Sequence, residues 1–122
     1  MNDLTHRAFF GDAEHAFTLS PAMIRELEAV TGAGIGAIYQ RLVDRLFHHS
    51  DMLHVIRLGL IGGGMAPEVA ARLVTTYAEP TPVLEIYKLS LDILTIRFFG
   101  ALDAGDEHEL DESAFEDAGQ GA

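Results

Sequence analysis

The stretch Met52–Gly64 reads MLHVIRLGLIGGG and joins an apolar run to three consecutive glycines. Before the glycines only His54 and Arg57 are strongly polar, so we predict a largely buried helix there. The residues Gly62, Gly63 and Gly64 disfavour a continuing helix, because glycine leaves the backbone free and has no side chain. We therefore predict an abrupt structural turn at these glycines. The turn would let the last two helices fold back over Leu53, Ile56 and Leu60.

Two short segments near the start of the chain, 6–10 and 15–19, have the bulky residues of β-strands and are separated by residues 11–14. In the second segment His15, Phe17 and Leu19 alternate with smaller residues, which places them on one face of a strand. This pattern predicts a β-hairpin. A lone hairpin is marginal in water, so we expect it to pack its aromatic side chains onto the helices.

The remaining segments have the apolar spacing of helices, and the first begins with the strong start signal Ser20-Pro21. We predict helices at about 21–31, 35–48, 52–61, 67–77 and 83–99. The expected fold class is α+β and mainly α, with an N-terminal β-hairpin packed on about five helices. A chain of 122 residues supports one hydrophobic core, so we expect a single domain over residues 1–102.

Acidic residues are concentrated at the end of the chain. The formal net charge is −11, and eight acidic residues but no Lys or Arg lie from Asp103 onward. Residues 1–102 hold eleven acidic and eight basic residues, a net charge of −3. We predict a disordered acidic C-terminal tail over 103–122, because that segment has too little apolar surface to offset its ordering entropy. The negative charge argues against nucleic acid as a ligand.

No motif of an enzyme or a cofactor site is complete. The chain has no cysteine, which excludes disulfides and thiolate metal ligands. Gly32, Gly34 and Gly36 miss the spacing of a dinucleotide loop, and Gly62–Gly64 lack the Lys-Ser/Thr of a phosphate loop. The apolar runs are too short for a bilayer, and the first residues do not resemble a secretory signal. We expect a cytoplasmic, non-enzymatic protein with no cofactor and no membrane partner.

One cluster of possible metal ligands deserves weighing: His48, His49, Asp51 and His54. Imidazole and carboxylate groups both bind zinc or iron. Adjacent histidines point away from each other on a helix, however, and the zinc signature with an intervening glutamate is absent. A polar connection between helices is the preferred interpretation, and a small metal-dependent enzyme is a third hypothesis that elemental analysis would test.

The last predicted helix is apolar around most of its circumference. Its polar residues Glu85, Lys88, Asp92 and Thr95 follow each other at spacings of three and four, which places them on a single stripe. A helix of this kind is either central to the fold or covered by another chain. The same apolar surface could also pair two copies, so the oligomeric state stays open.

Several segments, taken in order, resemble one known family. They are FFGDAEHAFTLSPAMIRELE, GIGAIYQRL, VIRLGLIGGG and a last helix that ends ILTIRFFGA. Together they are similar to the gene transfer agent and phage tail protein family typified by the tenth gene product of a gene transfer agent cluster. The resemblance spans about Thr5 to Ala101 and excludes the acidic tail.

The resemblance implies a tail assembly chaperone, which holds the tape measure protein until tail tube subunits polymerise around it. It also leaves open a structural role as a tail or tail tube associated component that stays in a phage-like particle. For the chaperone role we expect the last helix to bind apolar helical segments of the tape measure protein. The residues expected to form this partner-binding surface are Leu84, Tyr87, Leu91, Leu94 and Phe98.

Overall fold

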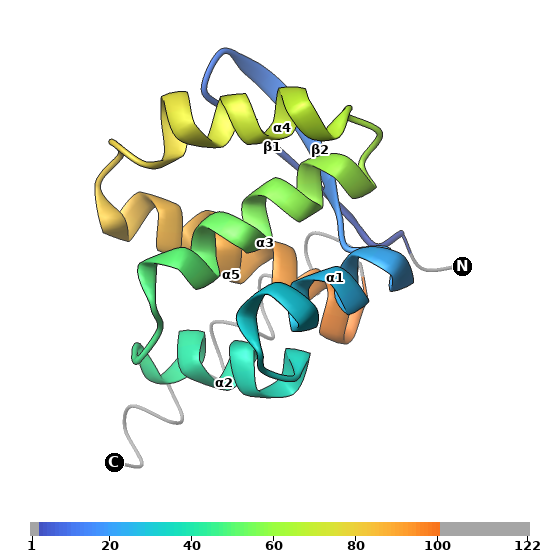
Figure 1. The fold of residues 1–122 in the computed structure, drawn as a ribbon, viewed down its shortest axis with the longest axis vertical. Coiled ribbons are helices and arrows are strands. Elements are labelled where there is room, and N and C mark those ends of the chain that lie inside the picture. The colour runs from blue at the N-terminus through green and yellow to red at the C-terminus, as the bar shows by residue number, and fades with distance from the viewer. Residues whose placement is uncertain (1–2, 101–122) are drawn as a thin grey trace, which may run out of the picture.

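The computed structural model describes residues 3–100, and the predicted tail at 103–122 lies outside the described residues. The predicted fold class is confirmed, since an antiparallel hairpin is followed by a set of helices (Figure 1). In order along the chain, the elements are β1 (Thr5–Phe10), β2 (Ala13–Thr18), α1 (Pro21–Thr31), α2 (Ile35–Asp44), α3 (His49–Gly62), α4 (Pro67–Leu73), the π-helical turn η1 (Val74–Ala78) and α5 (Val83–Phe99).

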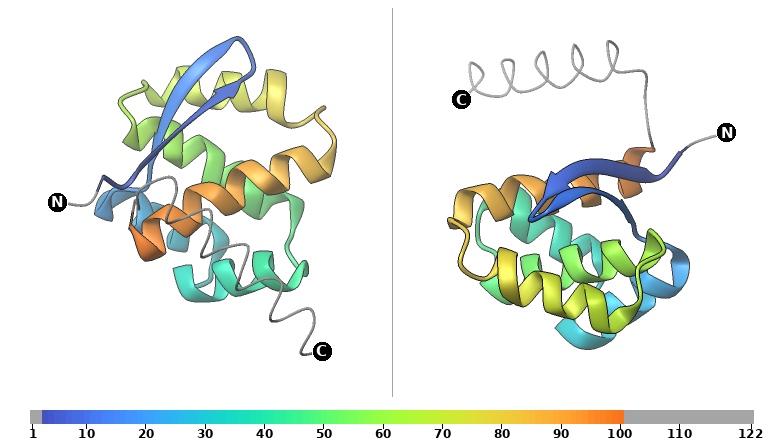
Figure 2. Two further views of the ribbon diagram at one scale, coloured as in Figure 1. Left: turned by 180° about the vertical axis from the view of Figure 1, so that it is seen from behind. Right: turned by 90° about the horizontal axis from the view of Figure 1, so that it is seen from above.

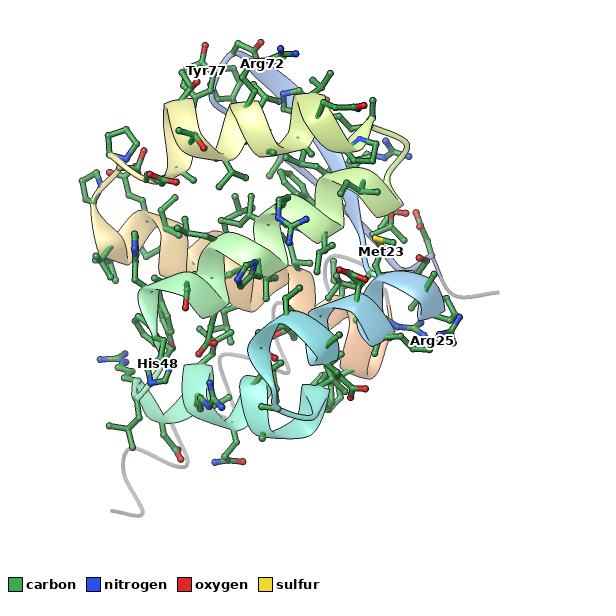
Figure 3. The ribbon with its side chains drawn as sticks, viewed as in Figure 1. Met23, Arg25, His48, Arg72 and Tyr77 are labelled. Carbon is green, nitrogen blue, oxygen red and sulfur yellow. The ribbon has the colours of Figure 1, made fainter. Side chains whose placement is uncertain are left out.

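The hairpin turns more tightly than the sequence predicted. Phe10 pairs with Ala13, so two residues form the turn where four were expected. Gly11 has a φ of 67°, a left-handed conformation that favours glycine. A Cβ atom at Gly11 would also overlap the ring of Tyr77 in η1. Figure 3 shows Tyr77 beside the hairpin tip, which is thus fixed to the π-helical turn.

The two longest helices, α3 and α5, pack against each other beneath the hairpin (Figure 2). The inner face of β2 contributes Phe17, which is fully buried, and α1 packs on the other side of α3. The apolar helix α5 was expected to be either central to the fold or covered by a partner chain, and in this structure it is central. Fully buried side chains from every part of this core include Phe17, Leu19, Leu27, Ile38, Leu42, Met52, Val55, Ile56, Leu60, Ile93 and Leu94.

The three glycines end α3 with a specific pattern of hydrogen bonds. The N–H of Gly64 donates to the carbonyl of Ile61 at 3.0 Å, and the N–H of Met65 donates to that of Leu60 at 3.0 Å. This pair of bonds is the Schellman motif, which needs a left-handed residue just after the helix. Gly64 provides it with a φ of 114°.

Gly62 and Gly63 have a different role, which the sequence did not indicate. A Cβ atom on Gly62 would collide with the carbonyl oxygen of Thr18, and one on Gly63 would collide with that of Ala16. Both carbonyls belong to β2, so the end of α3 lies directly against the backbone of this strand. The glycines therefore do more than reverse the chain, because they allow a helix end and a strand edge to touch.

We predict that Gly63→Val lowers the free energy of unfolding by about 1–3 kcal/mol, because the side chain forces the end of α3 away from β2. Gly63→Ala should have the same direction. Gly36→Ala is the matched control: Gly36 lies in α2 with open space around its Cβ position. That change should stabilise by about 0.5–1 kcal/mol, since alanine is the better helix former. Urea unfolding measures the free energy of unfolding of each variant. A Gly63→Val variant as stable as the native protein would contradict the close contact between α3 and β2.

The second helix is shorter than predicted. It was expected to continue to about residue 48, but α2 ends at Asp44. Arg45 follows with a φ of 62°, the left-handed conformation that glycine usually adopts at this position. Its N–H donates to Leu42 at 3.1 Å and that of Leu46 donates to Arg41 at 2.8 Å, which again is a Schellman motif. Apolar spacing alone predicted a continuous helix, because an arginine gives no stop signal.

We expect Arg45→Gly to stabilise the protein by about 0.5–1 kcal/mol. An L-residue in the left-handed region costs about 1–2 kcal/mol, and part of the gain is offset by the greater freedom of glycine when unfolded. Thermal and urea unfolding would measure the change. A loss of stability would show that the Arg45 side chain contributes more than its backbone strain costs.

Candidate partner-binding surface

The five predicted partner-binding residues of α5 lie along the side of the helix that runs beside α2, and two of them, Tyr87 and Phe98, contact α2 directly. Tyr87 donates its hydroxyl hydrogen to the carbonyl of Leu42 at 2.9 Å. Its ring also stacks on Phe47, with centroids 5.2 Å apart. At the other end of α5, Phe98 stacks on Tyr39 with centroids 4.5 Å apart. Much of the predicted surface is therefore a contact within the chain.

The prediction that all five side chains are available to a partner is wrong for Leu94, which is fully buried. Tyr87 and Leu91 are only partly exposed. Leu84 and Phe98 remain accessible, at 62% and 41% exposure. The sequence could not show this division, because the pattern of a single helix does not reveal which neighbour covers each side.

Near α2 and α5, sequence reasoning missed four other exposed apolar residues. Val43 and Leu46 lie at the end of α2 and are 47% and 73% exposed, and Val83 at the start of α5 is 51% exposed. Leu46 precedes Phe47 in the chain and Leu84 lies one turn before Tyr87, so these residues come from the two segments that the Phe47–Tyr87 stack joins. We name this surface the α2–α5 patch and define it as Val43, Leu46, Val83 and Leu84. The fourth missed residue is Phe99, 63% exposed beside Phe98.

The α2–α5 patch exists because α2 stops early. The left-handed Arg45 turns the chain after Asp44, so Leu46 does not continue on the buried face of α2. In a helix that continued to about residue 48, as predicted, Leu46 would lie one turn after Leu42, which is fully buried. Because the helix ends at Asp44, Leu46 is instead the most exposed member of this surface.

The possible metal ligands are separated by the fold. The carboxylate of Asp51 is buried and accepts from Arg41 Nη1 at 3.0 and 3.2 Å. It also accepts from the backbone N–H of His48 at 3.0 Å, which caps the start of α3. Figure 3 shows His48 at the connection between α2 and α3. Within residues 3–100 no three His, Asp or Glu side chains gather in a way that could hold a metal ion.

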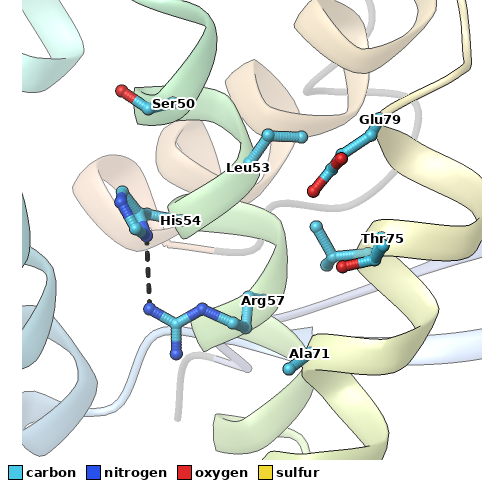
Figure 4. A pocket seen from close by; sticks show the side chains of 8 residues that line it. Ser50, Leu53, His54, Arg57, Ala71, Thr75 and Glu79 are labelled. Carbon is cyan, nitrogen blue, oxygen red and sulfur yellow. Dashed lines mark hydrogen bonds between the residues drawn. The ribbon is translucent and has the colours of Figure 1, made fainter.

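His54 has a different partner, Arg57, whose Nη2 lies 3.2 Å from His54 Nδ1 (Figure 4). Arginine can only donate, so Nδ1 accepts and the imidazole carries its proton on Nε2. Burial lowers the pKa of His54 below its usual 6.5, and the Arg57 charge lowers it further, against a smaller opposing effect of Asp51. The neutral ring is thus the form that the fold favours.

These two side chains line a pocket of about 210 Å³ between α3 and the α4–η1 segment. Figure 4 shows Ser50, His54 and Arg57 on α3, across from Thr75 and Glu79. Leu53, Ala71 and Val74 supply the apolar part of its wall. The pocket thus combines an apolar wall with one arginine and one carboxylate.

We predict that His54 makes the protein less stable in mild acid. A lowered pKa in the folded state means that the unfolded chain binds the proton more tightly. The stability that the neutral His54 ring contributes is therefore complete above about pH 6.5 and is lost as the pH falls through the folded pKa. His54→Gln keeps an acceptor for Arg57 but cannot titrate in this range. Its melting temperature should therefore fall less than that of the native protein between about pH 7 and about pH 5. Parallel curves would contradict this prediction.

Comparison with known proteins places the chain among the tail proteins of phages and phage-like particles. It belongs to the family described as "Phage tail tube protein, GTA-gp10", whose model matches residues 4–100. This match covers the hairpin and every described helix. No curated protein and no solved structure matches the chain. Among the described residues, no helix has both the length and the apolar character needed to cross a bilayer.

Proposed function

We propose that this protein is a non-enzymatic tail assembly chaperone that binds the tape measure protein during tail morphogenesis. The observation that carries the proposal is the α2–α5 patch, whose four aliphatic side chains are 47–73% exposed and come from the two segments that an aromatic stack joins. Isolated exposed apolar residues are ordinary, but a group of them marks an interaction surface. Membership in a phage tail family supports a tail protein as the partner.

The chemistry of the patch suits an amphipathic helix. Such a helix presents apolar side chains at spacings of three and four, and a partner surface of aliphatic residues buries them without any demand for directional bonds. The Phe47–Tyr87 stack joins the two segments that carry the patch, and the hydrogen bond from Tyr87 to the backbone of α2 holds them together. The protein meets this partner in the cytoplasm, and its acidic charge keeps the complex soluble.

Co-expression with the tape measure protein of the same gene cluster tests the proposal. The native protein should raise the soluble yield of the tape measure protein and copurify with it. The double variant Leu46→Ser, Leu84→Ser should weaken the complex by about tenfold or more, because exposed anchors at an interface can each contribute over 1 kcal/mol.

The matched control is Val30→Ser with Val69→Ser, which removes residues that are 40% and 37% exposed on α1 and α4. This control should bind as the native protein does, and both double variants should retain the native melting temperature. Absence of a complex with the native protein, or equal loss of binding in both variants, would contradict the proposal.

A structural tail component is the second candidate function, and the family description as a tail tube protein favours it. A tail component stays in the finished particle, whereas a chaperone leaves before assembly is complete. Quantitative mass spectrometry of purified particles separates the two functions. A stoichiometric amount in the particle would support the structural role, and absence from the particle would support the chaperone.

A further inference from the structure

The two edges of the hairpin differ. The carbonyls of Ala16 and Thr18 in β2 face Gly63 and Gly62 at the end of α3, so that helix end covers the outer edge of β2. The sheet has two strands, and within residues 3–100 no third strand lies beside β1. In Figure 2 the hairpin lies across the helices, and the contacts place β2 beside α3 and β1 beside α5.

The strand register shows which backbone groups of β1 point outward. Ala16 is paired with Arg7 and Thr18 with Thr5. Since the two β2 carbonyls face α3, these pairs are of the kind that does not exchange backbone hydrogen bonds. The pairs alternate, so the N–H and C=O groups of Thr5, Arg7 and Phe9 point away from β2, while those of Ala8 and Phe10 point toward it.

Other contacts agree with this assignment. The hydroxyls of Thr5 and Thr18 lie 2.8 Å apart, as expected where side chains approach closely in such a pair. The outward N–H of Thr5 donates to Asp3 Oδ1 at 3.0 Å. The outward groups of Arg7 and Phe9 are therefore the open part of the edge. THRAFF contains neither proline nor lysine, and Arg7 is the one charged side chain along this edge.

We propose that the β1 edge binds an extended segment of another protein, which adds a third strand to the hairpin at Arg7 and Phe9. The side chains that flank this edge indicate the chemistry of the segment. Phe9 is 73% exposed and offers an apolar contact. Arg7 is exposed and forms no ion pair with any of residues 3–100, so it complements a carboxylate on the added strand.

A second copy of this chain fits the edge less well. Two antiparallel registers of two β1 strands bring outward groups face to face, and each pairs five residues. One sets Arg7 opposite Arg7 of the other copy and the other sets it opposite Phe9, so neither register gives Arg7 a carboxylate partner. Like charges directly opposite each other destabilise a strand pair. The partner is therefore a different protein with an acidic residue at this position.

Amide hydrogen exchange of the full chain by NMR tests whether the edge is open. The amides of Arg7 and Phe9 should exchange much faster than those of Ala8 and Phe10. Equal protection of the two sets in the protein alone would overturn the proposal, because it would show that the edge is already covered.

Binding is tested with a probe peptide of about six residues, the usual length of a strand, that alternates valine and threonine around one glutamate. The peptide should slow exchange at Arg7 and Phe9. The same peptide with lysine for glutamate should bind about fivefold more weakly, and Arg7→Glu should reverse this preference. Arg25→Glu, an equal charge reversal on exposed α1, should leave it unchanged.

Two results would overturn the partner assignment. One is a peptide that leaves the exchange of Arg7 and Phe9 unaltered at millimolar concentration. The other is a dimer of the native protein in sedimentation experiments that Phe9→Lys abolishes, which would make a second copy the occupant. This test is independent of the α2–α5 patch, because none of its residues lies in β1.

Discussion

The contact between the end of α3 and the edge of β2 is the constraint on which the rest of the structure depends. Gly62 and Gly63 bring the helix backbone against the carbonyls of Ala16 and Thr18, a distance that no side chain would permit. This contact fixes the hairpin over the central helices. It also leaves the two edges of the hairpin unequal, since only one of them can face the end of α3.

The central position of α5 explains its unusual composition. Its apolar circumference is divided among α3, the hairpin and α2, whereas the charged residues Glu85, Lys88 and Asp92 stay exposed. Such a helix resembles a partner-binding helix when it is seen alone, because burial within the chain and burial against a partner require the same residues. The accessible apolar surface lies instead at the two ends of the α2–α5 contact.

Local signals in the sequence predicted much of the architecture. The hairpin, the Ser20-Pro21 helix start and the order of the helices all follow from apolar periodicity and from residues with strong conformational preferences. The end of α2 could not be predicted in this way, because Arg45 adopts the left-handed conformation without being glycine or asparagine. The surface around Leu46 was missed for the same reason. The ion pair between Arg41 and Asp51 was missed because it joins two helices, whereas the sequence places Asp51 beside histidines.

The sequence by itself determined that this protein is a mainly helical α+β protein, that its chain breaks sharply at Gly62–Gly64, and that its hairpin comes first. These features depend on interactions between residues close together in the chain, and such interactions are visible in spacing and composition. Only the tertiary structure decided which side of α5 is covered, which edge of the hairpin is open and why two of the three glycines are needed. Those outcomes depend on contacts between distant segments, and a periodic pattern does not record which segment supplies the contact.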